Sequence, residues 1–515
     1  MKKRRFYLSM LLSALLLALM AGGAQAIDLA DGKFVIHGKI SEQLNMRADK
    51  TSPGQLYDYS IFNFRTSFKL ETMYHIQQCP DHEWNAYGVW KQFYDYADKV
   101  DTGFDNYVRH MSGDKGISQL RAYHSFVDVC RELYLEYTTS LFQIRAGKQI
   151  VSWGETSFER TADIINPVDG RGLLNPGYPD FAEIKRGLWM FRLYYTPRGL
   201  PADMTFEGLI IPDFQPNYNW PAGYHLMHPD QFNLLKAPNE LFLNAYRDAP
   251  SDSWKNPQIG FRVRGFTWGF DWTVFYVNMQ NPNGTYKTGK ALPAQLIAAL
   301  GPGSLGGRVP YTNDVTNFQR YNNVGFTFNR PIAPVIPLIP GTPVRMSGCV
   351  FRNEFIAELS KKCADLVGIN NVTRSYNRYA DTLAWDGKIF IPGLSPWNRG
   401  KLLSTSTQLA QEWVPSKKDT YQIFPYNVYS PGRKYWATMT EAIDYGFWND
   451  RILVGLYAAY QLTPGKSYYT LMAAFKPTFR WTYMIRYLDY REGSTVRGYP
   501  TGPLDTVTFD ITYEF

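Results

Sequence analysis

The sequence predicts a transmembrane antiparallel β-barrel of the bacterial outer membrane, with about sixteen to eighteen strands. Three observations predict this fold. The chain begins with a secretory leader, it has no later apolar run of the roughly 18 residues that a membrane helix needs, and it repeats segments in which apolar and polar side chains alternate. Aromatic residues make up 16% of the chain, as expected for girdles at two membrane interfaces. We expect a single barrel with long external loops that fold partly into the lumen.

Residues 1–26 are typical of a cleavable signal peptide. The basic start MKKRR precedes an apolar run, and Ala24-Gln25-Ala26 fits the small-residue cleavage pattern. We therefore expect cleavage after Ala26, one barrel domain over 27–515 and export to the outer membrane. Removal of the leader's four basic residues reduces the 54 basic residues to 50, against 46 acidic ones. So small a net charge gives no reason to expect a nucleic-acid partner.

Alternation at both ends of the chain defines the expected barrel wall. Segments 34–46, 62–76, 131–150, 452–460 and 481–487 each place apolar side chains on one face and polar ones on the other. The last ten residues, TVTFDITYEF, alternate without exception and stop at Phe515. We expect this last strand to close the barrel against the first, and Phe515 to be recognised by the barrel-assembly machinery.

Short and long connections alternate between these segments. Short turns are expected at 138–140, 268–269 and 476–477, and long segments rich in Gly, Pro and Tyr at 95–128, 152–186, 212–257 and 280–320. Outer-membrane barrels have short periplasmic turns and long external loops. With both termini in the periplasm, the number of strands must be even.

One stretch of the chain carries a motif with individual character. Its residues are Arg131, Glu132, Leu133 and Tyr134, then Gly147 and Gln149, then Trp153, Gly154 and Glu155, and then Asn166, Pro167 and Asp169. This pattern resembles that of the proteobacterial outer-membrane family described as domain of unknown function 1302, with Ala146 and Lys148 as mild departures. The later Ile211-Pro212-Asp213-Phe214 also resembles a family element. The resemblance implies a monomeric outer-membrane barrel and no established substrate.

The hairpin within this stretch presents polar side chains to the lumen. By alternation these are Glu132, Tyr134, Glu136, Gln143, Arg145 and Gln149. Opposite charges on neighbouring strands lie within cross-strand reach, so the side chains either brace the lumen or line a constriction. The loop from Trp153 to Asp169 is expected to be a fixed structure in the mouth or lumen, in an architectural or a functional role.

Arginine dominates the charges that alternation places inside the barrel. The inward set is Arg65, Arg145, Arg192, Arg262, Arg264, Arg480 and Arg486. An arginine-lined pore attracts anions or the carboxylate of an amphipathic solute. The alternative is that these arginines pair with acids of the loops, which would cancel the preference.

Prolines recur at every third position from Pro331 to Pro343. This period is typical of one face of a polyproline II helix, and a strand within a sheet does not tolerate so many prolines. We expect an extended strut of about 40 Å across the barrel mouth, a segment that binds a partner, or a rigid loop without a ligand.

Four cysteines follow the leader. Pairing in sequence order would join Cys79 to Cys130 and Cys349 to Cys363. The expected topology places Cys79 and Cys130 at opposite ends of the barrel, too far apart for a disulfide, so the pairing stays open.

Three classes of function follow from these features. The first is a porin-like channel for small, anionic or amphipathic and aromatic solutes. The second is a non-conducting structural barrel that docks a periplasmic partner. The third, an outer-membrane hydrolase, has the least support because the sequence shows no nucleophile motif. No cofactor, metal or catalytic residue is expected, and the partners are outer-membrane lipids, the assembly machinery and a small solute, with a monomer favoured over a trimer.

Overall fold

The computed structural model describes residues 27–29, 32–48, 60–170, 181–218, 254–282, 285–286, 316–332, 335–367, 370–392, 402–415, 435–462, 467–491 and 505–515. The expected leader at 1–26 lies outside the described residues.

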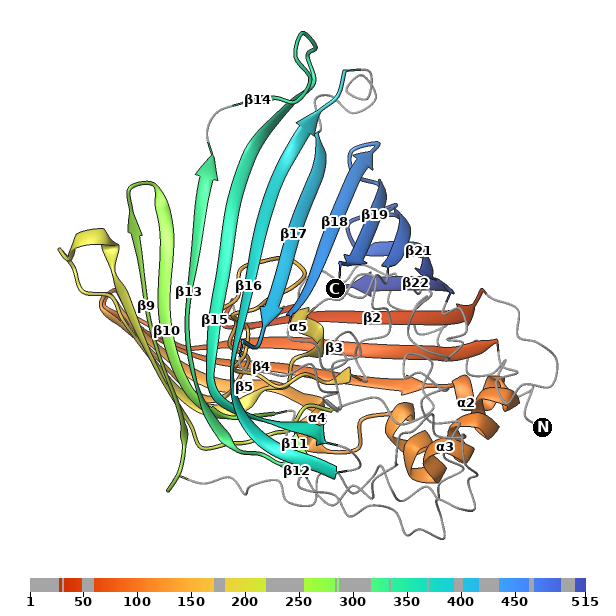
Figure 1. Cartoon of the computed structure of the whole chain (residues 1–515), viewed down its shortest axis with the longest axis horizontal. Coiled ribbons are helices and arrows are strands. Elements are labelled where there is room, and N and C mark those ends of the chain that lie inside the picture. The colour runs from red at the N-terminus through yellow and green to blue at the C-terminus, as the bar shows by residue number, and fades with distance from the viewer. Residues whose placement is uncertain are drawn as a thin grey trace.

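Eighteen antiparallel strands form one closed barrel (Figure 1). They are β2 (Phe34–Arg47), β3 (Ile61–Gln78), β4 (His82–Asp95), β5 (Cys130–Thr139), β6 (Phe142–Gln149), β7 (Leu188–Tyr195), β8 (Thr205–Ile211), β9 (Gln258–Thr267), β10 (Phe270–Gln280), β13 (Arg320–Ile332), β15 (Arg345–Val367), β16 (Asn370–Phe390), β17 (Leu403–Trp413), β18 (Tyr435–Phe447), β19 (Ile452–Gln461), β20 (Ser467–Phe475), β21 (Trp481–Arg491) and β22 (Thr506–Glu514). Two short strands, β1 (Ile27–Leu29) and β14 (Ile336–Pro337), extend this sheet, and β11 (Thr285–Tyr286) pairs separately with β12 (Thr316–Asn317). The predicted barrel is confirmed at the upper end of the expected strand number.

The last strand closes the barrel, as predicted. β22 pairs with β2 from Glu514 opposite Lys39 to Thr506 opposite Arg47. Beyond β22, the Phe515 N–H donates to the Gly38 carbonyl over 2.8 Å, and the Gly38 N–H donates back over 2.7 Å. A Cβ atom on Gly38 would lie 1.9 Å from the Phe515 ring, so the ring packs directly over this glycine and would have to move for any other residue.

Alternation sorts the side chains between the two faces of the wall. Exposed apolar side chains cover the outer face on most strands, among them Leu133, Leu135, Ile210, Ile259, Phe261, Val274, Val324, Phe326, Val454, Leu471, Ile485, Phe509 and Ile511. Residues of the opposite face, such as Arg192, Glu207 and Glu354, are buried inside the barrel. A lipid-facing apolar wall around a polar interior therefore surrounds the lumen.

Short and long connections alternate from β3 to β13, as predicted, but not beyond, since 333–344 joins β13 to β15 and only 368–369 joins β15 to β16. One end of the barrel carries the turns at 79–81, 140–141, 268–269 and 448–451, and the other end carries the connections 96–129, 150–187, 212–257 and 281–319. The described helices are α2 (Ala97–Val100), α3 (Thr102–Arg121), α4 (Phe126–Val129), α5 (Phe181–Ile184) and the 3-10 turn η2 (Pro201–Asp203). None of them combines the length and apolarity of a membrane-spanning helix.

The proline-rich segment differs from the predicted strut. Pro331 belongs to β13 and lies opposite Val350, and β14 pairs Pro337 with Arg345 of β15. The segment therefore prolongs the β13–β15 hairpin, which rises toward the top of Figure 1. The prolines are tolerated because β10 pairs with β13 only as far as Asn329, so the proline-rich part lies on a sheet edge where a missing N–H costs little.

The described thiols are free, and the sequence-order pairing is wrong. Cys79, Cys130 and Cys349 form no disulfide. Cys349 and Cys363 lie on the same strand, roughly 45 Å apart at the rise of an extended chain. Cys79 follows β3 in a short turn, whereas Cys130 begins β5 at the other end of the wall.

We expect an alkylating reagent to modify at least these three cysteines when the protein is unfolded without a reductant, because their thiols are unpaired. Mass spectrometry of the alkylated protein measures this directly. Labelling that appears only after reduction would contradict the free-thiol assignment.

Candidate functional site in the barrel lumen

The connection between β6 and β7, residues 150–187, folds into the barrel and contacts the opposite wall. We call it the inward segment; it is described except for residues 171–180. Its contacts reach β3 and β4 on one side and β15 to β19 on the other. The sequence predicted that long loops fold partly into the lumen, and this segment does so.

Glu354 on β15 anchors the inward segment to the far wall. Its carboxylate is fully buried and accepts hydrogen bonds from the Thr156 N–H at 2.6 Å, the Thr156 hydroxyl at 2.8 Å and the Ala162 N–H at 2.8 Å. The Glu155 N–H also donates to it. These donors satisfy the buried carboxylate.

Three further wall contacts extend this anchor. The Oε1 of Gln408 on β17 accepts from the Phe158 and Glu159 N–H groups at 3.2 and 3.1 Å. The hydroxyls of Thr161 and Thr382 on β16 lie 2.6 Å apart. The Phe158 ring packs against Tyr457 of β19, with ring centroids 4.7 Å apart. The tip of the segment thus contacts β15, β16, β17 and β19.

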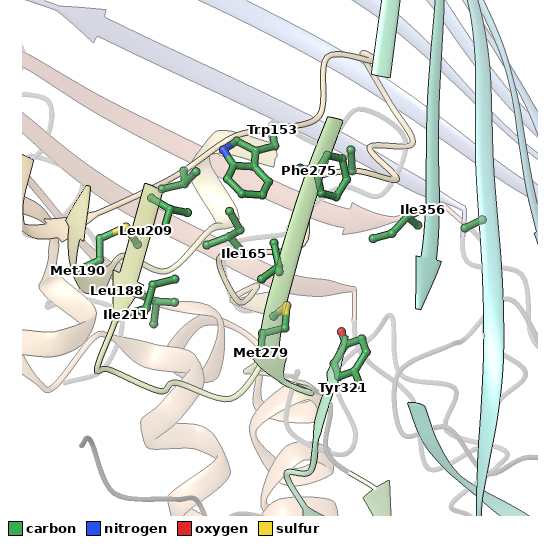
Figure 2. Close-up of a cluster of buried hydrophobic side chains, with 14 residues drawn as sticks. Trp153, Ile165, Leu188, Met190, Leu209, Ile211, Phe275, Met279, Tyr321 and Ile356 are labelled. Carbon is green, nitrogen blue, oxygen red and sulfur yellow. The ribbon is translucent and has the colours of Figure 1, made fainter. Parts of the chain in front are cut away.

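Trp153 anchors the inward segment by packing into a buried apolar cluster. Figure 2 shows its ring near side chains of β7, β8 and β10 and beside Phe275, and the two ring centroids lie 5.3 Å apart. Its indole N–H donates to Glu207 Oε1 at 3.2 Å, and the Arg262 guanidinium lies 5.3 Å from the ring centre. Next to β7, β8 and β10 the interior of the barrel is therefore packed with side chains.

The other motif residues clamp the two ends of the inward segment together. The Asn166 side chain accepts from the Val151 N–H at 2.6 Å and donates to the Gln149 and Arg186 carbonyls. The Pro167 carbonyl accepts from the Arg186 N–H at 2.8 Å. The Asp169 N–H donates to the Ile184 carbonyl at 2.6 Å.

Two residues at the start of β5 complete this clamp. The Arg131 guanidinium donates to the Glu183 carbonyl at 3.2 Å and to the Lys185 carbonyl. Glu132 accepts from the Ile150 N–H at 3.1 Å. Most residues of the sequence motif therefore hold the inward segment in place.

Glycines allow two close approaches in this clamp. Gly147 has a φ of +140°, and a Cβ atom there would lie 2.3 Å from the Leu133 carbonyl oxygen. At Gly154 a Cβ atom would lie 3.1 Å from Glu354 Oε2, which is tighter than ordinary contact. Gly147 is a strict requirement, whereas Gly154 lets the chain approach Glu354.

Charged groups fix the second end of the segment. Glu183 forms ion pairs with Lys91 at 2.5 Å and Lys69 at 3.1 Å. Burial alone would raise the pKa of Glu183, but attraction to Lys91 and Lys69 lowers it well below its usual range. Burial lowers the pKa of Lys185, although the ion pair with Asp163 acts against this.

The structure pairs five of the seven predicted inward arginines with acids, mostly of neighbouring strands. Arg65 pairs with Asp95, Arg145 with Glu136, Arg192 and Arg262 with Glu207, and Arg486 with Asp510. Arg264 is exposed, and it forms no ion pair in the described part of the chain. Arg480 lies in the turn before β21 rather than on a strand.

The remaining hairpin residues lie where alternation placed them. Gln143 donates to Glu136 at 3.0 Å, and the Arg145 guanidinium lies 5.2 Å from the Tyr134 ring centre. Gln149 is buried and donates to the Met190 carbonyl at 3.2 Å. These side chains contact one another within the wall, whereas the inward segment crosses the lumen.

Glu159 on the inward segment has a shifted pKa. Burial, together with the negative charge of Glu412, raises the pKa of Glu159 to about 6. Its backbone is held by Gln408, whereas its carboxylate makes no ion pair within the described ranges. The segment therefore carries a charge that changes near neutral pH.

We expect the cation permeability of the barrel to fall as the pH is lowered from about 7.5 to about 5. Glu159 is ionised above its pKa and neutral below it, so the lumen loses one negative charge over this interval. Reversal potentials under a salt gradient measure the change, and Glu159→Gln should remove it. A pH response unaltered in Glu159→Gln would contradict the assignment.

The fold and the inward segment define the class of this protein: a closed membrane-type β-barrel whose lumen is crossed by one of its own connections. The chain belongs to the family described as Protein of unknown function (DUF1302), whose model matches residues 7–420. No curated protein matches the sequence.

Solved structures that are similar to the chain include OccK9 (OpdG) of Pseudomonas aeruginosa, at 8% identity and a TM-score of 0.47 over 94% of this chain and 98% of that one. They also include a BenF-like porin from Pseudomonas fluorescens Pf-5, at 9% identity and a TM-score of 0.47 over 94% and 98%. These likenesses are too distant to assign a residue role or a substrate to this chain.

Proposed function

We propose that the protein is a porin-like outer-membrane channel, acting as a monomer, whose passage runs beside the inward segment. The observation that carries this proposal is the anchoring of that segment across the lumen by Glu354, Gln408 and Thr382. A segment fixed at both ends would narrow a barrel of this size, which suits slow passage of small solutes.

Charge selection by the channel should be weak. Five of the seven arginines form ion pairs with four acids, because Arg192 and Arg262 share Glu207. Most of the positive charge behind a strong anion preference is therefore offset. Arg264 and the carboxylates of Glu155 and Glu159 lie near the passage. Burial raises the pKa of Glu155, and the nearby Arg264 and Arg352 act against that rise.

Planar-bilayer recording of the refolded protein tests the proposal. We expect discrete single-channel openings with a reversal potential close to zero under a salt gradient. A well-folded barrel that never conducts, in wild-type form or after deletion of residues 151–165, would contradict the channel and favour a docking role.

A further inference from the structure

The outer face of the barrel carries an acidic side chain where lipid is expected. Glu441 is the middle residue of the thirteen in β18. Its chain neighbour Thr440 is buried and lies opposite Gln408, which binds the inward segment, so Thr440 faces the lumen and Glu441 faces outward. Exposed Met439 and Tyr435 share the outer face with it.

Glu441 lies far from both membrane interfaces. The exposed Tyr435 marks one end of β18, and the exposed Trp448 follows the other end. A barrel strand crosses the bilayer in about 9–11 residues, so the centre of β18 lies at mid-depth. Charged side chains at this depth of a lipid-facing wall are destabilising and mark functional sites.

Two hydroxyls of the neighbouring strand hold the carboxylate in place. Thr405 on β17 donates to Glu441 Oε1 at 2.6 Å, and Thr407 donates to Oε2. Each carboxylate oxygen retains a lone pair for one more donor. On the other side of Glu441 stands Ala458 of β19, and such a small residue leaves room for a side chain from another molecule.

We propose that Glu441, Thr405, Thr407 and Ala458, here named the Glu441 patch, bind a membrane-spanning segment of another protein that presents a basic side chain at mid-depth. Charge complementarity selects this occupant, because lipid tails offer no hydrogen-bond donor to a carboxylate. A second copy of this chain is disfavoured because it would have to supply the basic side chain itself. Lys148 lies on the outer face, but α4 covers it and it donates to the Val127 and Cys130 carbonyls. Arg330 lies near the end of β13 and not at mid-depth.

A second outward acid provides an internal control. Glu42 on β2 accepts from Thr66 of β3 at 2.6 Å, but it lies opposite the bulky Ile511 of β22 rather than an alanine. We therefore place the binding site at Glu441 and not at Glu42.

Energy transfer in phosphatidylcholine vesicles tests the proposal. The labelled full-length barrel is mixed with a synthetic leucine-alanine helix that carries one central lysine, and with a matched helix that carries leucine there. We expect the lysine helix to bind at least tenfold more tightly than the leucine helix. Glu441→Gln should abolish this difference, and Glu42→Gln should leave it unchanged.

A steric variant keeps the test decisive if Glu441→Gln does not fold. Ala458→Trp leaves the acid in place and fills the space beside it, so it should also abolish lysine-dependent binding. Equal binding of both helices, or an undiminished preference in Glu441→Gln, would overturn the proposal. Barrel–barrel energy transfer that is lost in Glu441→Gln would also overturn it, because the occupant would then be a second copy.

Discussion

Glu354→Ala is expected to increase the single-channel conductance at least twofold. The substitution removes the acceptor of hydrogen bonds from Glu155, Thr156 and Ala162. Each buried donor left without a partner costs about 1–3 kcal/mol, so the inward segment should leave β15 and widen the passage. Planar-bilayer recording measures the change.

Glu136→Ala is the matched control for this prediction. Glu136 is also an inward acid, but it binds Arg145 and Gln143 on the neighbouring strand and does not touch the inward segment. Its conductance should stay near the wild-type value. An unchanged conductance in Glu354→Ala, with the barrel folded, would show that Glu354 does not hold the constriction.

Trp153→Ala is expected to destabilise the protein by about 3–5 kcal/mol, the usual cost of removing a large buried aromatic side chain. Trp153 is 1% exposed and packs between Phe275 and the Arg262 guanidinium. Its loss also removes a donor to Glu207. Urea titration of the detergent-solubilised barrel, followed by tertiary circular dichroism, gives the free energy of unfolding.

Trp153→Phe separates the two contributions of this side chain. Phenylalanine keeps one aromatic ring in the cluster while it loses the indole N–H and part of the apolar contact, so we expect a clearly smaller loss of stability than for alanine. If Trp153→Ala unfolds at the same urea concentration as the wild type, the packing of Trp153 does not contribute to stability.

The wall of the barrel was predictable because it is built from local rules. Period-two alternation fixes which side chains face lipid, and it holds from Leu133 on β5 to Ile511 on β22. The closure of β22 on β2 followed from the same pattern. Of the three alternatives for the proline-rich segment, the strut was wrong because local rules do not reveal whether a strand edge is paired beyond Asn329.

The lumen was only partly predictable. The motif residues from Arg131 to Asp169 were identified by their unusual sequence, and they do hold the inward segment. Their partners Glu354, Gln408 and Thr382 were missed. Glu354 lies 199 residues from Glu155 in the chain, and such a pairing depends on the closed barrel rather than on spacing. One feature of the sequence could have pointed to Glu354. It is an inward-facing acid, and its cross-strand neighbours Thr327 and Thr382 carry no positive charge to pair with it.

The ion pairs of the inward arginines were also not predictable from the sequence. Alternation predicted that Arg192 and Arg262 face inward, but both form ion pairs with Glu207, which the sequence did not single out and which offsets one of their two positive charges. Net lumen charge depends on every inward acid, so a list of arginines alone overstates anion preference.

The central claim is that the inward segment lies across the lumen against β16, and a single cross-link tests it most directly. In a variant whose four native cysteines are replaced by alanine, Thr161→Cys and Thr382→Cys would place two thiols where the hydroxyls lie 2.6 Å apart. We predict a disulfide that forms spontaneously in the membrane-inserted barrel and is detected as a linked peptide pair by mass spectrometry. Free, separately alkylated thiols at both positions in a folded barrel would contradict the account.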